Sequence, residues 1–384
     1  MKSSRQVAPP TAPTTISGLS GAFTLGEGLS LAGRVLSATP FGFKDFKKYY
    51  GAVGNGSTLD SQALIDALSD GTNLNVFVPP GNYLLDDATY PATKRNKQLV
   101  GSGMFSPRNY GTNLAGSPPY TNLSSTSNFI TPSTTKDVIY AGSDNVTLCG
   151  FNINQLTGTT RTSGSNIQHG PKNDADTTYE SYGAHVVVGG SIFNIGTESS
   201  WVSLKLGQHW DLNFGNLFFY NCLKNGIVGD FAPPYGGSYA TGFIKIAGKA
   251  GSGGNTTIAA SVGAGVYITQ ADVLTWICAL NTWRTLHGIH MNVATGKTVG
   301  NQKFSGGYFD NVIGGYGVKM EITGTGICTN NDLIGFGVNT GNALGSYSVG
   351  TGCTDNGLAH VKGIYGSLGT PVNNGTRTAI TDCR

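Results

Sequence analysis

The amino-acid sequence predicts a folded, β-rich and turn-dense protein, and three features of its composition carry that prediction. Gly occurs 58 times in 384 residues, whereas a chain of average composition would hold roughly 27. Glu occurs only at positions 27, 180, 198 and 321, while Asn occurs 31 times. Because Gly and Asn interrupt helices, this balance excludes a helical bundle. A hydrophobic fraction of 39% excludes a disordered polymer, so we expect one large domain or two with an ample core.

The charged residues give no indication of a nucleic-acid or membrane partner. The formal net charge is +3, and the basic residues are densest at 44–48 and 94–97, where neither group forms a stripe that could follow phosphates. The sequence has no apolar run of roughly 18 residues, the length that a membrane span needs. The first residues, MKSSRQVAPPTAPTT, lack the apolar centre of a secretory signal peptide. Because the composition is nevertheless typical of extracellular proteins, we expect assembly in a cytoplasm and action outside it.

The cysteines are spread along the chain without the close spacing that a metal site needs. They lie at 149, 222, 278, 328, 353 and 383, with no Cys-x-x-Cys pair. No Cys/His spacing supplies zinc ligands, and a chain of this length does not need disulfide staples. We therefore expect buried free thiols, no metal and no cofactor.

The N-terminal residues and the segment that follows them differ in kind. Residues 1–40 are rich in Pro, Ser, Thr and Gly, which predicts either an extended arm that attaches the protein to a partner or a plain disordered tail. Residues 49–85 read YYGAVGNGSTLDSQALIDALSDGTNLNVFVPPGNYLL. This segment predicts a glycine-dense turn, a helix over about 58–70 capped by Ser57 or Thr58, and two strands around Pro79-Pro80-Gly81. Ala63, Leu64, Ala67 and Leu68 give the helix an apolar stripe.

The same segment resembles a known family signature. Tyr50-Gly51-Ala52, two further glycines, Thr58-x-Asp60-Ser61, a short Ala/Leu helix and a strand ending in Pro-Pro-Gly-x-Tyr are similar to the N-terminal signature of the pectate-lyase-like right-handed parallel β-helix family. That family includes bacteriophage tailspikes, capsule depolymerases, polygalacturonases and pectate lyases. Leu59 stands where the family commonly has an acid. The resemblance implies an all-β, single-stranded right-handed solenoid over 41–384, whose first coil is covered by the helix.

Internal repeats agree with a solenoid. Residues 306–318 align with 326–338 at an offset of 20, Cys353-Thr354-Asp355-Asn356 repeats Cys328-Thr329-Asn330-Asn331 at 25, and 288–291 resembles 317–320. Stacking of equivalent residues predicts one inward ladder and one turn ladder. The inward ladder would hold Cys278, Tyr308, Cys328 and Cys353, and the turn ladder Asn281, Asn311, Asn331 and Asn356. Residues 101–136 and 155–183 lack strand periodicity, so we expect long loops or insertions there.

Catalytic candidates are few because acids are scarce. A glycosidase needs two carboxylates, and the candidates are Asp211, Asp230 and Asp272, with Glu321 next. Alternation over 201–220 places Asp211 outward and Trp210 on the apolar, buried face. A lyase needs a base, for which His287, His290 and Arg284 are candidates, although the histidines equally suit a turn. No catalytic motif of the family is present, so the sequence leaves enzymatic activity open.

Sugar binding needs outward aromatic residues with polar neighbours. The candidates are Trp201, Tyr179, Tyr182, Tyr235, Tyr239, Trp283 and Arg284. With the resemblance, they predict a phage tailspike or tail-fibre protein that recognises a host cell-surface polysaccharide, with or without cleaving it. The resemblance implies a homotrimer in the virion, bound to other tail proteins through 1–40. The alternatives are a polysaccharide-degrading hydrolase or lyase and a purely structural tail component.

Overall fold

The computed structural model describes residues 29–32, 35–38, 42–104, 126–171, 186–231, 236–248, 263–310, 312–339, 344–365 and 371–381. The chain divides into two units, Met1–Phe41 and Gly42–Arg384. In the first unit, β1 (Leu29–Ala32) and β2 (Val35–Ala38) form an antiparallel hairpin, where the sequence predicted an extended arm. Two short strands separated by only two residues pair readily with each other, which is why this part of the arm is not extended.

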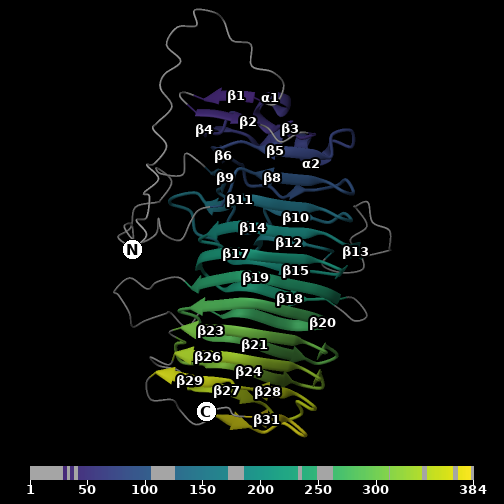
Figure 1. The fold of residues 1–384 in the computed structure, drawn as a ribbon, viewed down its shortest axis with the longest axis vertical. Coiled ribbons are helices and arrows are strands. Elements are labelled where there is room, and N and C mark those ends of the chain that lie inside the picture. The colour runs from purple at the N-terminus through teal and green to yellow at the C-terminus, as the bar shows by residue number, and fades with distance from the viewer. Residues whose placement is uncertain are drawn as a thin grey trace, which may run out of the picture. The chain divides into compact units, whose positions relative to one another are not determined.

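The second unit consists of parallel strands that stack coil upon coil (Figure 1). Sheet I contains β3 (Lys44–Asp45), β4 (Asn55–Leu59), β5 (Asn75–Val78), β6 (Gly81–Leu84), β8 (Gln98–Gly101), β9 (Ser127–Thr131), β11 (Thr147–Gln155), β13 (Val187–Val188), β14 (Ser191–Glu198), β16 (His209–Trp210), β17 (Asn213–Cys222), β19 (Gly236–Gly248), β22 (Thr298–Gly300), β23 (Lys303–Asp310), β25 (Ile327–Thr329), β26 (Asp332–Asn339), β28 (Gly357–Ala359), β29 (Lys362–Tyr365) and β31 (Ala379–Thr381). Sheet II contains β7 (Tyr90–Pro91), β10 (Ile139–Ala141), β12 (Ser165–His169), β15 (Val202–Leu206), β18 (Asn225–Asp230), β21 (His287–Ala294), β24 (Tyr316–Thr323), β27 (Gly345–Val349) and β30 (Val372–Asn373). Strand β20 (Ala264–Trp283) runs from sheet II into sheet I.

The strand register confirms a parallel β-helix and corrects the length of one repeat. Ile289 pairs with Val318 and Met291 with Met320, as the resemblance of 288–291 to 317–320 predicted. Lys303 pairs with Asp332, so the step between these coils is 29 residues and the offset of 20 was wrong. The offset of 25 is confirmed near the C-terminus, where a bridge joins Thr329 to Thr354.

The two predicted ladders were right only in their last two members. Asn331 donates to Asn356 Oδ1 at 2.8 Å, and Cys328 and Cys353 are both buried beside that bridge. Cys278 and Tyr308 do not join them, because Asn281 pairs with Tyr308 and Gly242 with Cys278. Asn311 lies outside the described residues. Of the five described cysteines, Cys222, Cys278, Cys328 and Cys353 are buried, as predicted, whereas Cys149 is only half-buried.

One corner of the solenoid is built from residues with left-handed backbone, one in nearly every coil. It precedes the long strands of sheet I and holds Asn96, Asn145, Gly189, Asp211, Gly237, Asn301, Asn330, Asp355 and Arg377. Asn and Asp tolerate this conformation better than other non-Gly residues because their side chains bond to nearby polar groups. Asn145 Nδ2, for example, donates to Asn96 Oδ1 at 3.2 Å. We call this series the left-handed corner.

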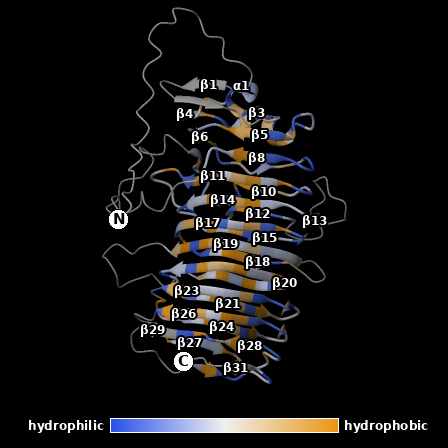
Figure 2. Ribbon diagram, in the orientation of Figure 1, coloured by the Kyte–Doolittle hydropathy of each residue, from blue (hydrophilic) through white to orange (hydrophobic). Residues whose placement is uncertain are grey.

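Apolar side chains of successive coils fill the interior in one continuous cluster. Hydrophobic residues recur along the strands of coil after coil, as orange bands on the ribbon (Figure 2). Aromatic rings stack within it. Phe214 lies 5.1 Å from Trp276, and Trp276 lies 5.0 Å from Phe304, measured between ring centroids. The interior is therefore a continuous packed core rather than a channel.

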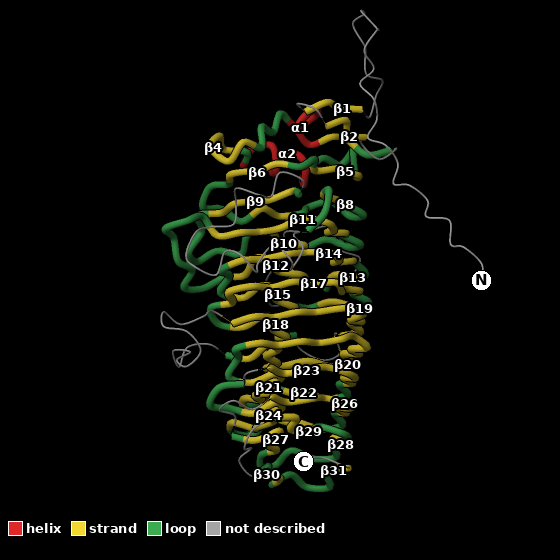
Figure 3. Tube along the Cα trace, turned by 60° about the vertical axis from the view of Figure 1, so that its left-hand side comes forward, coloured by secondary structure: helices red, strands yellow, loops and turns green. Residues whose placement is uncertain are grey.

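Two short helices lie at the N-terminal end of the solenoid (Figure 3). They are α1 (Phe46–Tyr50), which the sequence did not predict, and α2 (Ser61–Ser69). The apolar stripe of α2 is buried as predicted. The helix begins after Asp60 rather than after Ser57 or Thr58, which belong to β4.

Two segments predicted to be loops contain strands. Strand β9 lies within 101–136 and β12 within 155–183. Their sequences, SNFIT and SNIQH, are fully buried, so polar side chains occupy positions where the prediction expected apolar ones. Within the described residues, no helix is long and apolar enough to cross a membrane.

Candidate functional site

The outer surface of sheet II carries one side chain per coil in a straight series. Strand register aligns Lys205 with Val228, Val228 with Tyr267, Tyr267 with His290, and His290 with Lys319. Their strand neighbours, such as Leu204, Ile289 and Met320, are fully buried, so these five alternate residues point away from the core. Four of them are half-buried, whereas Val228 is covered and only 9% exposed. We call this series the outer row; its members are spaced by about 4.8 Å.

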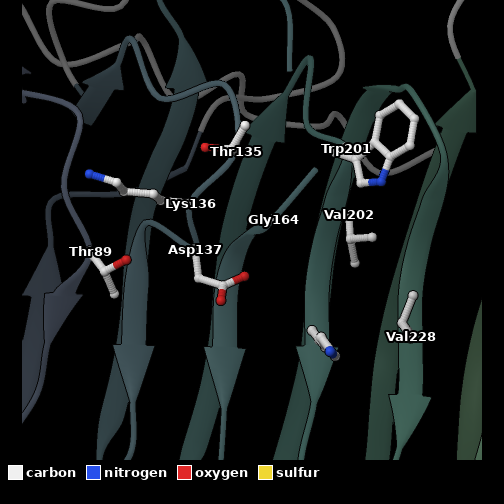
Figure 4. Close-up of a pocket in the computed structure, with 9 residues that line it drawn as sticks. Thr89, Thr135, Lys136, Asp137, Gly164, Trp201, Val202 and Val228 are labelled. Carbon is white, nitrogen blue, oxygen red and sulfur yellow. The ribbon is translucent and has the colours of Figure 1, made fainter. Parts of the chain in front are cut away.

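A cavity of about 480 Å³ lies at one end of the outer row. It lies across the N-terminal ends of β7, β10, β12, β15 and β18. Lys136 and Trp201 lie on opposite sides of Asp137 (Figure 4). Its lining is Thr89, Thr135, Lys136, Asp137, Gly164, Trp201, Val202, Lys205 and Val228. Lys205 and Val228 belong to the outer row, so the cavity and the row form one surface.

The side chains that line the cavity differ in whether they already form hydrogen bonds within the protein. Asp137 is 7% exposed, and its Oδ1 accepts from the backbone N–H of Ser165 at 2.8 Å and from its hydroxyl at 2.7 Å. Lys136 Nζ donates to the carbonyl of Asp87 at 2.6 Å. Asp137 is thus a structural residue, whereas the half-buried ring of Trp201 offers a stacking surface for an apolar sugar face.

Towards the other end of the row, His290, Lys319 and Glu321 form a connected cluster. His290 Nε2 lies 2.7 Å from Glu321 Oε1, and Lys319 Nζ lies 2.7 Å from Glu321 Oε2. Both carboxylate oxygens of Glu321 are therefore engaged. The side chains stay accessible, with 12% of His290 and 32% of Glu321 exposed.

Tyr267 on the neighbouring strand β20 and Asn292 on β21, the strand that also holds His290, complete this cluster. The ring of Tyr267 lies 5.2 Å from that of His290, and Asn292 Nδ2 donates to the Tyr267 hydroxyl at 3.1 Å. Thr323 in turn donates to Asn292 Oδ1 at 3.0 Å. Because the Tyr267 oxygen accepts from Asn292, its own O–H remains a donor for a ligand.

Burial and pairing shift the protonation of the cluster in opposite directions. Burial lowers the pKa of His290, although Glu321 opposes the shift. Burial alone would raise the pKa of Glu321, but hydrogen bonds from Lys319 and His290 outweigh it, and the pKa is lowered. Burial and the charge of His290 lower the pKa of His287 to about 3. At neutral pH the cluster thus holds a neutral imidazole beside an ionised carboxylate.

The structure places the three aspartates named from the sequence in three different settings. Asp211 is an exposed member of the left-handed corner. Asp230, on β18, accepts from the Thr269 hydroxyl at 3.0 Å and faces Lys297 Nζ at 3.7 Å. Asp272 accepts from Asn301 Nδ2 at 2.8 Å. Trp210 and Asp272 both align with Gly236, so Asp211 and Asp272 belong to coils two steps apart.

The aromatic candidates are similarly dispersed. Trp201 lines the cavity, Tyr239 is 42% exposed on sheet I, and the Arg284 guanidinium stacks 4.0 Å above the Trp283 ring at the end of β20. Tyr179, Tyr182 and Tyr235 lie outside the described residues. Trp210 is 41% exposed, which corrects the prediction that it is buried.

Sequence reasoning named His290 and Glu321 but missed Lys205, Tyr267 and Lys319. The signal was present: each alternates with buried aliphatic residues in a strand, as in Gly-Val-Lys-Met-Glu-Ile over 317–322. Within the described part of the chain, no cluster of His, Cys, Asp or Glu could hold a metal ion.

Comparisons with known proteins return structural neighbours only. No protein-family model and no curated protein matches the sequence. Among solved structures, tailspike protein 2 of Escherichia coli O157:H7 bacteriophage CAB120 has 12% identity and a TM-score of 0.45, over 90% of this chain and 47% of that one. ORF18 of Geobacillus virus E2 has 15% identity and a TM-score of 0.35, over 88% and 61%. The A-module of the Azotobacter vinelandii mannuronan C-5 epimerase AlgE6 has 12% identity and a TM-score of 0.36, over 87% and 99%.

This chain thus spans less than two thirds of either phage protein. The neighbours are phage proteins and a polysaccharide-modifying enzyme, at identities that bear on architecture alone. The assignment of a parallel β-helix rests on the strand register itself.

Proposed function

We propose that this chain is a tailspike-like component of a phage virion and that the outer row of sheet II binds a polysaccharide of the host cell surface. The observation that carries the proposal is the continuity between the Trp201 cavity and the row from Lys205 to Lys319. A linear glycan needs a long surface with an aromatic ring for stacking and spaced polar groups for its hydroxyls, and this surface offers both.

We further propose that residues 1–40 attach the chain to other tail proteins and that three copies assemble into a homotrimer. The resemblance of the segment 49–85 to the N-terminal signature of the pectate-lyase-like parallel β-helix family, which includes trimeric phage tailspikes, supports both statements. A purely structural tail component is the alternative, and it requires no glycan binding by the outer row.

Binding of labelled full-length protein to an array of bacterial capsular and lipopolysaccharide glycans tests the proposal. Wild-type protein should bind at least one glycan, and Trp201→Ala should weaken that binding by about tenfold or more because the stacking ring is lost. The matched control is Trp210→Ala, which removes an exposed Trp from sheet I.

Absence of any bound glycan would favour the structural alternative. Equal loss in Trp201→Ala and Trp210→Ala would remove the cavity from the binding surface.

A further inference from the structure

The cluster around His290 contains the parts of a general base. Glu321 Oε1 lies 2.7 Å from His290 Nε2, and an ionised carboxylate can only accept a hydrogen bond. A neutral His290 therefore carries its proton on Nε2 and its lone pair on Nδ1. Glu321 thus fixes the tautomer and would stabilise the imidazolium that forms when Nδ1 takes a proton, as an acid residue does behind a catalytic histidine.

Hydrolysis of a glycosidic bond does not suit this cluster. That reaction uses two carboxyl groups that are at most about 9.5 Å apart. Along the outer face, Asp230 and Glu321 stand on β18 and β24, three coil steps apart through β20 and β21. At about 4.8 Å per step, the separation is about 14 Å. Both oxygens of Glu321 are also engaged already.

Elimination from an acidic sugar is disfavoured by charge. The cation of the cluster already faces a carboxylate, since Lys319 contacts Glu321 at 2.7 Å. Lys297 likewise contacts Asp230 at 3.7 Å. A uronate would add a further carboxylate, and the described residues of the cluster hold no unpaired cation to compensate it. A neutral acyl group carries no such cost.

We propose that His290, held by Glu321, is the general base of a site that hydrolyses O-acyl esters on the bound glycan. The proposal rests on the proposed glycan binding for its substrate. His290 Nδ1 takes a proton from water while the water oxygen bonds to the ester carbonyl carbon, and the π pair moves to the carbonyl oxygen. The Tyr267 O–H and a free N–H of Lys319 stabilise that oxyanion.

Collapse of the tetrahedral intermediate balances the reaction. The carbonyl re-forms, the bond to the sugar oxygen breaks, and that oxygen takes the proton from the imidazolium. The products are a carboxylic acid, which ionises in solution, and the free sugar hydroxyl. His290 is the catalytic residue, and Glu321 is a positioning residue.

The experiment measures acetate by nuclear magnetic resonance and 4-nitrophenolate by absorbance, using the full chain with chemically O-acetylated dextran and with 4-nitrophenyl acetate. Wild-type protein should hydrolyse at least one probe, and His290→Asn should lower the rate by about 100-fold or more. His360→Asn is the matched control, because His360 is exposed with left-handed backbone that suits Asn. Thermal unfolding checks that both variants fold.

The pH profile separates a positioning role of Glu321 from a structural one. The groups facing His290 are Tyr267 on β20, His287 on its own strand, and Lys319 and Glu321 on β24. The rate should rise with pH and level off above a midpoint below 6.5, since burial lowers the pKa of His290. Glu321→Gln should lower the rate and move the midpoint further down, because Glu321 raises that pKa.

Equal rates for wild type and His290→Asn on both probes would overturn the esterase site. Glycan binding on the array without His290-dependent acetate release would overturn it while leaving the proposed function intact. Hydrolysis of 4-nitrophenyl acetate that depends on His290, without binding to any glycan, would support the esterase site and overturn the proposed glycan binding.

Discussion

Charged side chains serve different purposes in the N-terminal cap, by which we mean residues 42–101 with α1 and α2, and at the outer row. In the cap, Asp60 is 2% exposed and accepts from the backbone N–H groups of Val53 and Gly54 at 2.6 and 3.1 Å. Lys97 is fully buried and donates to the carbonyls of Asp70 and Asn73, each at 2.7 Å. Both residues satisfy main-chain groups that the ends of the first coils would otherwise leave without partners.

In the cluster beside the outer row, the charged groups of Lys319 and Glu321 contact other side chains rather than the main chain. The carboxylate of Glu321 contacts only His290 and Lys319 among the interactions described above. Removal of such a group leaves no backbone donor or acceptor unsatisfied. Charged side chains that bond to buried main-chain groups, such as Asp60 and Lys97, are therefore needed for folding. Charged side chains that pair with one another on the outer face of a sheet, such as Glu321, are available for function.

Substitution of Lys97 should give the largest effect. Lys97→Met keeps the buried apolar stem but removes two hydrogen bonds from a charged donor, so we expect a loss of about 4 kcal/mol in the free energy of unfolding. Denaturant unfolding followed by circular dichroism measures it.

Lys205→Met is the matched control on the outer row, and its effect should stay within about 0.5 kcal/mol. Comparable destabilisation by both substitutions would break the distinction between the two regions.

Glu198 tests the distinction between the two regions through the pH dependence of stability. Its carboxyl group is buried, as Asp60 and Lys97 are, but its partner is a side chain, as for Glu321. It is 8% exposed on β14, Asn221 donates to its Oε1 at 3.4 Å, and burial raises its pKa to about 7 from the 4.5 of the unfolded chain. Between these values unfolding releases a proton, so stability should fall as pH rises. Glu198→Gln cannot titrate and should remove up to about 3 kcal/mol of that fall. Thermal unfolding at pH 5 and 8 measures the difference.

Glu321→Gln provides a control of opposite sign. The pKa of Glu321 is lowered by Lys319 and His290, so its contribution to stability is present above its unfolded pKa and is lost as pH falls. A Glu198→Gln variant that keeps the wild-type pH dependence would show that this carboxyl is not buried in solution.

The sequence predicted most reliably where one pattern had one structural cause. The stripe Ala63, Leu64, Ala67 and Leu68 fits a helix that buries one face, and it is buried. The offset of 20 failed because glycines serve more than one purpose in each coil. It matched Gly315, where a side chain would collide with the carbonyl of Leu286, to Gly335, which has a φ of +77°.

The site was less predictable than the fold because the alternation of inward-facing and outward-facing side chains does not continue through a corner of the solenoid. Asp211 has a φ of +59°, so Trp210 and Leu212, which alternate in the sequence, lie on either side of a corner and one of them is exposed. The outer row joins residues from five coils at steps of 23 to 39 positions along the chain. Only the register between coils brings them together, and local periodicity does not contain it.

Asp211 gives the smallest expected effect and decides between two explanations of one residue. Its left-handed backbone suits Asp, Asn or Gly, so Asp211→Asn should change the free energy of unfolding by less than about 0.5 kcal/mol, whereas Asp211→Ala should cost about 1 kcal/mol. Thermal unfolding measures both. A catalytic carboxylate would behave differently, since Asp211→Asn would then abolish glycan cleavage while the stability of the fold stayed unchanged. The position of Asp211 in a corner that repeats Asn, Gly and Asp favours the first outcome.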